Sequence, residues 1–492
     1  MWEIADSVTK GRMAVSKSNI AAGSVVHIEM PTAYVPYADS SHSRCSSYAY
    51  SDTETGMLSA ASRSTGGKFR GYAIILAARV ITSSRANTPT DESVKALCRN
   101  LSRCSEDTPS PHIASAQIVQ RLLSCSPLTS NVALKDCLAV LEKLESNAFT
   151  VSDYDQSSVS GIGLYALAAA INHSCNPNCC QTFDLSTSGA LSIRALRNIE
   201  KGEEITIAYI DVGKPTWWRR EELQKSYGFL CSCNRCHSSS SDGYRCLTTG
   251  CKGIARIDEC DLFLSWKSFS GQQNESNKIT KAKADSIEYH SLEISFPYGD
   301  ILQERNDFHS FLGDTSEKFH AKKRKTKFKC DSCSTSICSS LIAKKINCLN
   351  NRLIGITRER KHEVNLSHRK QILEMLLQLV RPTDSSVIDF YRNYLLDDLL
   401  LEKHFEVYLQ VVRESHYLEH LNNRYPWGHP FPAIQQAVYA KCSLQSCQSG
   451  SDFDEAVGIL NQSISTLIIS HGYDATIVLE LLNIARRAVK CN

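Results

Sequence analysis

The chain has 492 residues, and at roughly 150 residues per domain this length predicts about three domains or one domain with large insertions. Lys and Arg number 55 and Asp and Glu 52, so the formal net charge of +3 gives no long-range attraction to nucleic acid or anionic membrane. The start of the chain lacks the apolar core of a signal peptide, and the longest apolar run, 162–171, is far shorter than the roughly 20 residues that cross a bilayer. We expect a soluble, monomeric protein of the cytoplasm, the nucleus or both, with no direct binding to nucleic acid or membrane.

Residues 1–35 alternate between apolar and polar side chains around Gly11 and Gly23, which predicts a small antiparallel meander. The next segment, 36–75, is rich in Ser, Thr and Gly and is expected to be a weakly structured insertion. Over 76–145 apolar residues recur at helical spacing, which indicates three or four helices.

Strand character returns over 146–214. Residues 190–195 alternate, and 205–209 are expected to end a hairpin whose turn is 200–203. Helices would then be an insertion within a β fold, which gives an α+β class.

Cysteine spacing predicts metal sites rather than disulfides, because the cytosol keeps thiols reduced and close pairs then serve as zinc ligands. Cys231, Cys233 and Cys236 form a CxCxxC motif over 215–240, and the remote Cys175 would complete four thiolates for a tetrahedral structural zinc.

Paired cysteines recur over 241–340. Two pairs separated by a long insertion are typical of a zinc ribbon and indicate a second zinc, with Cys260 and Cys338 as alternative ligands. The four expected ligands are Cys246, Cys251, Cys330 and Cys333. A basic run at 322–325 in the same segment is either solvated surface or a nuclear localisation or nucleic-acid patch.

The last segment, 341–492, is helical throughout. Asp452 and Glu455 are spaced as a capping box, an apolar stripe follows, and Gly472 is expected to stop the helix. Successive helical hairpins of this kind predict a tetratricopeptide-like array.

Two polar features interrupt the apolar elements. Asn172 and His173 follow an apolar run and can read a polar ligand, although such a pair alone more often makes a structural hydrogen bond. Tyr209 ends a strand, where a tyrosine more often packs in a core. Their occurrence together with the cysteine motif favours a site.

These segments resemble the SET-domain protein lysine methyltransferases, and within them the SET-and-MYND group. The resemblance rests on segments in the family's order, namely 147–150 (NAFT), 161–165 (GIGLY), 172–179 (NHSCNPNC), 202–211 (GEEITIAYID), 227–236 (YGFLCSCNRC), 425–430 (YPWGHP) and 470–472 (SHG). It implies a SET-domain β fold, formed by 1–35 and 146–214 and followed by a zinc-binding post-SET region.

The implied activity is methyl transfer from S-adenosylmethionine to lysine side chains of a histone or another protein. A protein substrate or peptide tail would lie in a groove between the SET and carboxyl-terminal domains. By resemblance, Tyr209 is catalytic. The cofactor residues are Gly11, Arg12, Asn147, Asn172, His173, Tyr209 and Phe229, and the substrate channel is formed by Phe183, Tyr227 and Phe229.

The chain departs from the family pattern at two places. Met13 stands where the second glycine of a Gly-x-Gly turn is expected, which predicts weaker cofactor binding or a rearranged loop. Between Pro31 and Tyr72 only Cys45 and His42 could serve a MYND zinc finger, so this finger is expected to be absent. Two rival hypotheses follow: a noncatalytic SET-like scaffold that binds peptides, and a zinc-dependent nucleic-acid binder, against which the near-neutral charge weighs.

Overall fold

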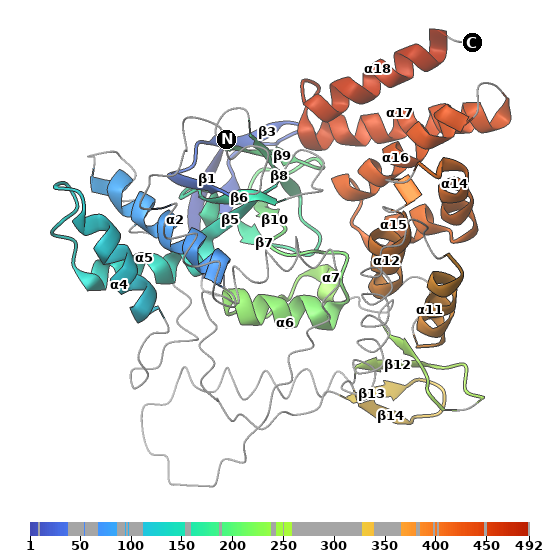
Figure 1. Cartoon of the computed structure of the whole chain (residues 1–492), viewed down its shortest axis with the longest axis horizontal. Helices are drawn as coiled ribbons and strands as arrows, with labels where there is room; N and C mark the ends of the chain where they lie inside the picture. The colour runs from blue at the N-terminus through green and yellow to red at the C-terminus, as the bar shows by residue number, and fades with distance from the viewer. Residues whose placement is uncertain are drawn as a thin grey trace.

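The computed structural model describes most of the chain. The described residues are 1–7, 10–37, 54, 67–85, 94, 97, 112–152, 159–185, 189–237, 243–248, 250–257, 327–338, 366–379, 384–396, 399–400, 403–446 and 450–490. The protein is a mixed α+β molecule in which strands occupy the middle, one group of helices lies on one side and the carboxyl-terminal helices lie on the other (Figure 1). Among the helices described, none has the length and apolar content needed to cross a membrane.

The amino-terminal strands form a hairpin at the edge of a four-stranded sheet. Strand β1 (Trp2–Ser7) pairs antiparallel with β2 (Gly11–Ser16). Gly11 begins β2 with φ of +67°, a left-handed conformation that favours glycine. Strand β10 (Glu204–Ile207) then pairs antiparallel with β2 and parallel with β7 (Asn172–His173).

Six further strands form two three-stranded antiparallel sheets. In the first sheet the strand order is β3 (Val25–Glu29), β9 (Ala190–Ala195) and β8 (Cys179–Asp184). In the second sheet the order is β4 (Ala33–Pro36), β6 (Val159–Leu164) and β5 (Ala148–Ser152). The expected meander over 1–35 is therefore wrong beyond β2, since β3 and β4 pair with distant strands. The expected hairpin is also wrong, because β9 and β10 lie in different sheets. Alternation marks which face of a strand is buried, and leaves its partner undetermined.

Helices α2 (Gly67–Arg85), α4 (Ile113–Ser124) and α5 (Leu134–Asn147) pack together against β4 and β6. Their shared core includes Ile75 and Leu76 of α2 and Leu141 of α5, all fully buried. Helix α2 begins inside the expected 36–75 insertion. The rest of that insertion, including His42 and Cys45, lies outside the described residues apart from the end of β4, Tyr37 and Glu54.

Two helices and a small sheet follow β10. Helix α6 (Thr216–Tyr227) ends at Gly228, whose φ is +77°, and α7 (Asn234–His237) follows. Strands β11 (Tyr244–Arg245), β12 (Ile254–Ile257), β13 (Lys327–Cys330) and β14 (Ser336–Cys338) form an antiparallel ribbon. Phe328 of this ribbon packs against Tyr244 and against Trp217 of α6. The basic run 322–325 and Cys260 lie outside the described residues.

The carboxyl-terminal part is helical in all its described residues. Its elements are α11 (Leu366–Leu379), α12 (Ser385–Tyr391), the π-helical η4 (Arg392–Leu396), α14 (Phe405–Glu414), α15 (Tyr417–Arg424), α16 (Pro430–Ser446), α17 (Ser451–His471) and α18 (Thr476–Lys490). Helix α17 begins directly after Gly450, so Asp452 lies in its first turn and the expected cap at that residue is wrong. The end of α17 docks on the strands, where the Cys180 thiol donates to the Ser470 carbonyl at 3.4 Å.

Candidate active site

A small cavity opens where α5, β5, β8 and the end of β10 meet. It has a volume of about 40 Å³, and three aromatic side chains, Phe149, Tyr209 and Tyr227, form part of its wall. The rings of Tyr209 and Tyr227 lie 4.8 Å apart at an angle of 40°. The remaining lining residues are Ser146, Asn147, Ala148, Thr150, Ala169, Gln181 and Ala208.

Tyr209 is held by three hydrogen bonds. Its Oη donates to the Ile171 carbonyl at 2.6 Å, and its backbone N–H donates to Nδ1 of His173 at 3.0 Å. Tyr227 Oη donates to the Tyr209 carbonyl at 3.5 Å. Because the phenol proton is committed to Ile171, the remaining lone pairs of Oη can only accept hydrogen bonds.

His173 joins this tyrosine to the cysteine cluster. Since Nδ1 accepts from Tyr209, the ring proton lies on Nε2, which faces Cys175 Sγ at 3.3 Å. Burial lowers the pKa of His173 to about 3, so the imidazole is neutral. Both ring nitrogens are thus engaged within the protein.

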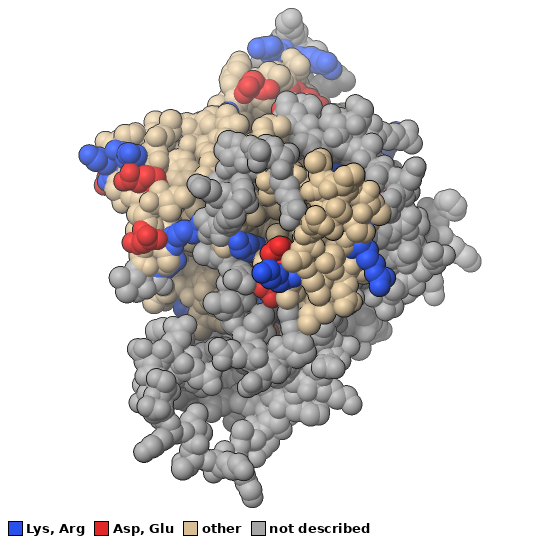
Figure 2. Space-filling view, turned by 90° about the vertical axis from the view of Figure 1, so that its left-hand side faces the viewer, with Lys and Arg blue, Asp and Glu red and all other residues tan. Residues whose placement is uncertain are grey.

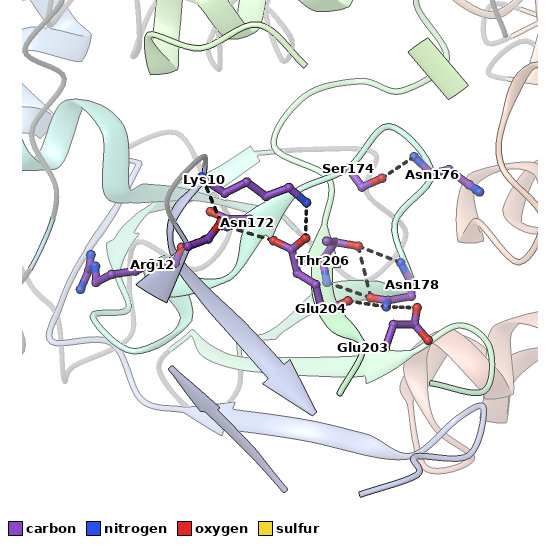
Figure 3. A network of polar contacts seen from close by, with 10 residues as sticks. Lys10, Arg12, Asn172, Ser174, Asn176, Asn178, Glu203, Glu204 and Thr206 are labelled. Carbon is purple, nitrogen blue, oxygen red and sulfur yellow. Dashed lines mark hydrogen bonds and ion pairs between the residues drawn. The ribbon is translucent and has the colours of Figure 1, made fainter. Parts of the chain in front are cut away.

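Asn172 lies at the centre of a polar network that connects three segments of the chain (Figure 3). Its Nδ2 donates to the Arg12 carbonyl and to Glu204 Oε1, both at 3.0 Å. The other carboxylate oxygen, Glu204 Oε2, pairs with Lys10 Nζ at 2.5 Å. Both amide hydrogens of Asn172 are therefore used, and its Oδ1 remains an acceptor.

Asn178, which is 1% exposed, fastens the same loop to β10. Its Nδ2 donates to Glu203 Oε1 at 3.0 Å and to the Glu204 carbonyl at 2.8 Å, and its Oδ1 accepts from the Thr206 N–H at 2.8 Å. These contacts fix the position of β10 relative to the segment that carries Asn172 (Figure 3).

Of the other expected site residues, one lines the cavity and two lie outside its lining. Asn147 lines the cavity, and its Nδ2 donates to the Lys143 carbonyl at 2.7 Å. Phe229 lies 6.3 Å from the His173 ring and packs with the first cysteine cluster, outside the cavity lining. Phe183 packs in the core, 5.8 Å from Tyr165 and outside the cavity lining, and its place in a substrate channel stays a prediction.

Seven of the ten lining residues, among them Phe149 and Gln181, are not site residues expected from the sequence. Phe149 lies within the recognised NAFT segment, and Gln181 stands two residues before Phe183 on the same face of β8. Gln181 Nε2 donates to the Ala208 carbonyl at 3.0 Å, which ties β8 to the residue before Tyr209. From the sequence, Gln181 could be identified only by choosing it over Phe183, because both lie on the same face of β8.

Met13 does not occupy a position that requires glycine. It lies within β2, opposite Ala5 of β1, and the positive φ occurs at Gly11. A Cβ atom placed on Gly11 would meet nothing within 4 Å, so the turn leaves open space beside it. The expectation that Met13 disrupts the loop is therefore not supported by its backbone.

The first cysteine cluster is built as expected from Cys175, Cys231, Cys233 and Cys236, with all four sulfurs within 4.8 Å of one another. Thiolates at about 2.3 Å from a tetrahedral zinc lie roughly 3.8 Å apart. The distances from Cys175 Sγ to those of Cys231 and Cys236 are 3.9 and 3.5 Å. Buried Arg219 places Nη2 3.8 Å from Cys236 Sγ, a positive charge suited to a four-thiolate metal site.

The second cluster also assembles. Cys246 Sγ lies 3.5 Å from Cys333 Sγ, and Cys251 Sγ lies 3.7 Å from Cys330 Sγ. Backbone N–H groups of Thr248, Gly253 and Ser332 point at three of these sulfurs from 3.4 to 3.5 Å. Such donors stabilise thiolates, so both clusters can hold a metal ion.

An ion pair and two hydrogen bonds join the loop after Tyr209 to residues of the carboxyl-terminal helical part. Lys214 pairs with Asp389 of α12, Arg424 Nε donates to the Gly213 carbonyl, and Tyr425 Oη donates to Asp211 Oδ1 at 3.0 Å. Burial alone would lower the pKa of Lys214, but the carboxylates of Asp389 and Asp211 outweigh it and raise this pKa. We call this set of six residues the latch: Asp211, Gly213, Lys214, Asp389, Arg424 and Tyr425.

Known proteins similar to this chain agree with the geometry. The SET domain family matches residues 11–210. Histone-lysine N-methyltransferase ASHR1 of Arabidopsis thaliana is 32% identical over 175 residues, which cover 34% of this chain and 35% of the relative. Histone-lysine N-methyltransferase SMYD3 of Homo sapiens is 38% identical over 107 residues, covering 22% and 24%. N-lysine methyltransferase SMYD2-A of Xenopus laevis is 30% identical over 169 residues, covering 34% and 38%. The chain thus matches between about a quarter and two fifths of the length of these relatives.

Proposed function

We propose that this chain, whose residues 11–210 form a SET domain, is a protein-lysine N-methyltransferase that uses S-adenosylmethionine. The observation that carries the proposal is the cavity walled by Tyr209, Tyr227 and Phe149, in which Tyr209 Oη is bonded to Ile171, the residue before Asn172. The relatives bear names of histone-lysine and N-lysine methyltransferases, which supports the same substrate class, a lysine of a histone or of another protein.

The cavity suits the end of a lysine side chain. Lysine in water has a pKa of about 10.4, and removal from water lowers it, so a buried amine is more readily neutral and nucleophilic. Oη of Tyr209 offers only lone pairs, which can accept an N–H of that amine and orient it. The aromatic wall would hold the methylated, positively charged product by cation–π attraction of roughly 0.5–2 kcal/mol.

The residues present also fit the cofactor. Asn172 Oδ1 can accept from a ligand amino group, and open space beside Gly11 admits a ligand close to the backbone. When bound, S-adenosylmethionine would supply a methyl group on a sulfonium sulfur. Gly11, Arg12, Asn147 and Asn172 would hold it, and the chain's contribution to the reaction would be mainly to position the lysine amine.

We propose Zn²⁺ as the metal of both cysteine clusters, with a structural role, because four sulfurs leave no open coordination position. The substrate segment would lie in a groove between the SET domain and the carboxyl-terminal helices. Helices α16, α17 and α18 share one core, which supports a tetratricopeptide-like arrangement of that domain. A monomer in the cytoplasm or nucleus accords with these features.

Against the rival hypothesis of a noncatalytic peptide-binding scaffold, Met13 lies within β2 opposite Ala5, and the left-handed backbone occurs at Gly11. The nucleic-acid hypothesis gains no support from the face shown in Figure 2, where the described Lys and Arg side chains lie next to Asp and Glu. Calorimetric titration with S-adenosylhomocysteine distinguishes the proposed methyltransferase from a noncatalytic scaffold, because a scaffold without a cofactor site would give no binding heat.

The decisive experiment incubates the protein with labelled S-adenosylmethionine and a cell lysate. Tyr209→Phe should lower methyl transfer roughly 10²-fold or more, the range seen when one polar group at a charged transition state is lost. Tyr473→Phe is the matched control, because this tyrosine is 58% exposed between α17 and α18 and should leave the rate unchanged. Absence of labelled protein from the unaltered chain, under conditions where a related methyltransferase is active, would overturn the proposal.

A further inference from the structure

We infer that Glu204 is a positioning residue that sets which way the Asn172 amide faces, and that Lys10 holds Glu204 in place for this task. The inference rests on the proposed function, because it assigns the cofactor-facing role to Asn172 Oδ1. Asn172 comes from the short strand β7, Glu204 from β10 and Lys10 from the turn before β2 (Figure 3).

An amide side chain is nearly symmetrical in shape, so its direction depends on its hydrogen-bond partners. Asn172 Nδ2 faces two oxygens, the Arg12 carbonyl and Glu204 Oε1, each at 3.0 Å. A carboxylate and a carbonyl can only accept. Rotating the amide by half a turn would place Oδ1 against both oxygens, so the observed direction is enforced.

Glu204 is itself fixed at both ends. Its backbone pairs with Val15 in the sheet, and its carbonyl accepts from Asn178 Nδ2 at 2.8 Å. Its side chain is 18% exposed and its second oxygen is held by Lys10, which is 55% exposed. The Lys10 contact is open to solvent, so its contribution should be small and should decrease with added salt.

Glu203 provides a matched control one residue away. It belongs to the same network, but its carboxylate contacts Asn178 and Arg197, and no described contact joins it to Asn172 (Figure 3). A change at Glu203 thus removes a carboxylate from the neighbouring residue without releasing the Asn172 amide.

The test is calorimetric titration of S-adenosylhomocysteine into the full chain and its variants. Glu204→Ala should weaken binding about tenfold, the factor expected for one charge-assisted hydrogen bond, whereas Glu203→Ala should change it less than about twofold. Glu204→Gln keeps an acceptor for Asn172 and should weaken binding less than Glu204→Ala. With S-adenosylmethionine, Glu204→Ala should raise KM by a larger factor than it lowers kcat.

A double variant separates positioning from a general structural effect. In an Asn172→Ala background, Glu204→Ala should cause no further loss of affinity, because there is no amide left to orient. An additional tenfold loss in that background would overturn the inference, and so would full affinity in Glu204→Ala alone. If the unaltered chain gives no binding heat, the proposed function fails and this inference with it.

Discussion

The side chain of His173 connects the first cysteine cluster to Tyr209, the tyrosine that lines the cavity. Its ring accepts from the Tyr209 N–H on one side and faces Cys175 Sγ on the other. The imidazole that a family resemblance assigns to the cofactor is therefore occupied within the protein. Replacing His173 should lower the stability of the protein as well as its activity.

We expect His173→Ala to lower the free energy of unfolding by about 1–3 kcal/mol, because the Tyr209 N–H loses its acceptor in a buried place. Urea denaturation measures this difference. His416→Ala is the control, since His416 has a side chain that is 70% exposed and should alter stability by less than about 0.5 kcal/mol. Overlapping unfolding curves for the two variants would contradict the assigned role of His173.

Single residues also show how far the sequence could define the site. Tyr209, Tyr227 and Asn172 were found because contiguous motifs mark them, and the structure places all three near one another. The sequence favours Phe183 as a channel residue, whereas Gln181 of the same strand lines the cavity. A sequence does not show how far along a strand a cavity extends. The sequence pattern places Met13 at the second glycine of a turn, whereas the residue with the left-handed backbone is Gly11.

The second cysteine cluster, for which we propose zinc, depends on close approach between the start of β12 and the turn that follows Cys330. A Cβ atom on Gly253 would lie 2.5 Å from Cys330 Sγ and 2.6 Å from Ser332 Oγ. We expect Gly253→Ala to prevent metal binding at the second cluster, so that metal analysis falls from about two zinc ions per chain to about one. Retention of both ions in this variant would show that the knuckle can move aside.

Helix α17 offers an opposite change at a glycine. Gly458 lies in the exposed middle of this helix, and a Cβ atom there would meet nothing within 4 Å. We expect Gly458→Ala to raise the free energy of unfolding by about 0.5–1 kcal/mol, because alanine loses less backbone entropy in a helix. Chemical denaturation tests the direction, and zinc content should stay the same as in the unaltered chain. A lower stability would indicate an unseen neighbour at this position.

Elements were predicted better than their partners. Helical periodicity identified α4, α5 and α17 because a 3.6-residue pattern is local to one element. Strand alternation likewise marked β9 and β10 as strands. It could not reveal that β9 pairs with β3 and β10 with β2, because those contacts join segments far apart in the chain.

At the scale of the molecule, the latch joins the carboxyl-terminal helices to the loop beside the cavity. It connects the loop that follows Tyr209 with α12 and α15. The side chains of Lys214 and Asp389 are only 11% and 15% exposed, so this ion pair is largely removed from water. A buried pair is costly to break from one side, because one charge is then left without a partner.

We expect Lys214→Met to destabilise the protein by about 3–5 kcal/mol, because Asp389 stays buried without its cation. The double variant Lys214→Met with Asp389→Leu should recover most of this loss, because no charge remains unpaired. Denaturation of the single and double variants gives both values. A double variant no more stable than the single one would mean that the pair contributes through shape and not through charge.

The pairing of β2 with β10 has a consequence for synthesis of the chain. Lys10 and Glu204 are 194 positions apart, and at about 5–20 residues per second a ribosome needs roughly 10–40 s to make the intervening chain. During that time the hairpin of β1 and β2 exposes an edge strand that has no partner. Until β10 emerges, the edge of β2 in the nascent chain is therefore open to pairing with a wrong strand.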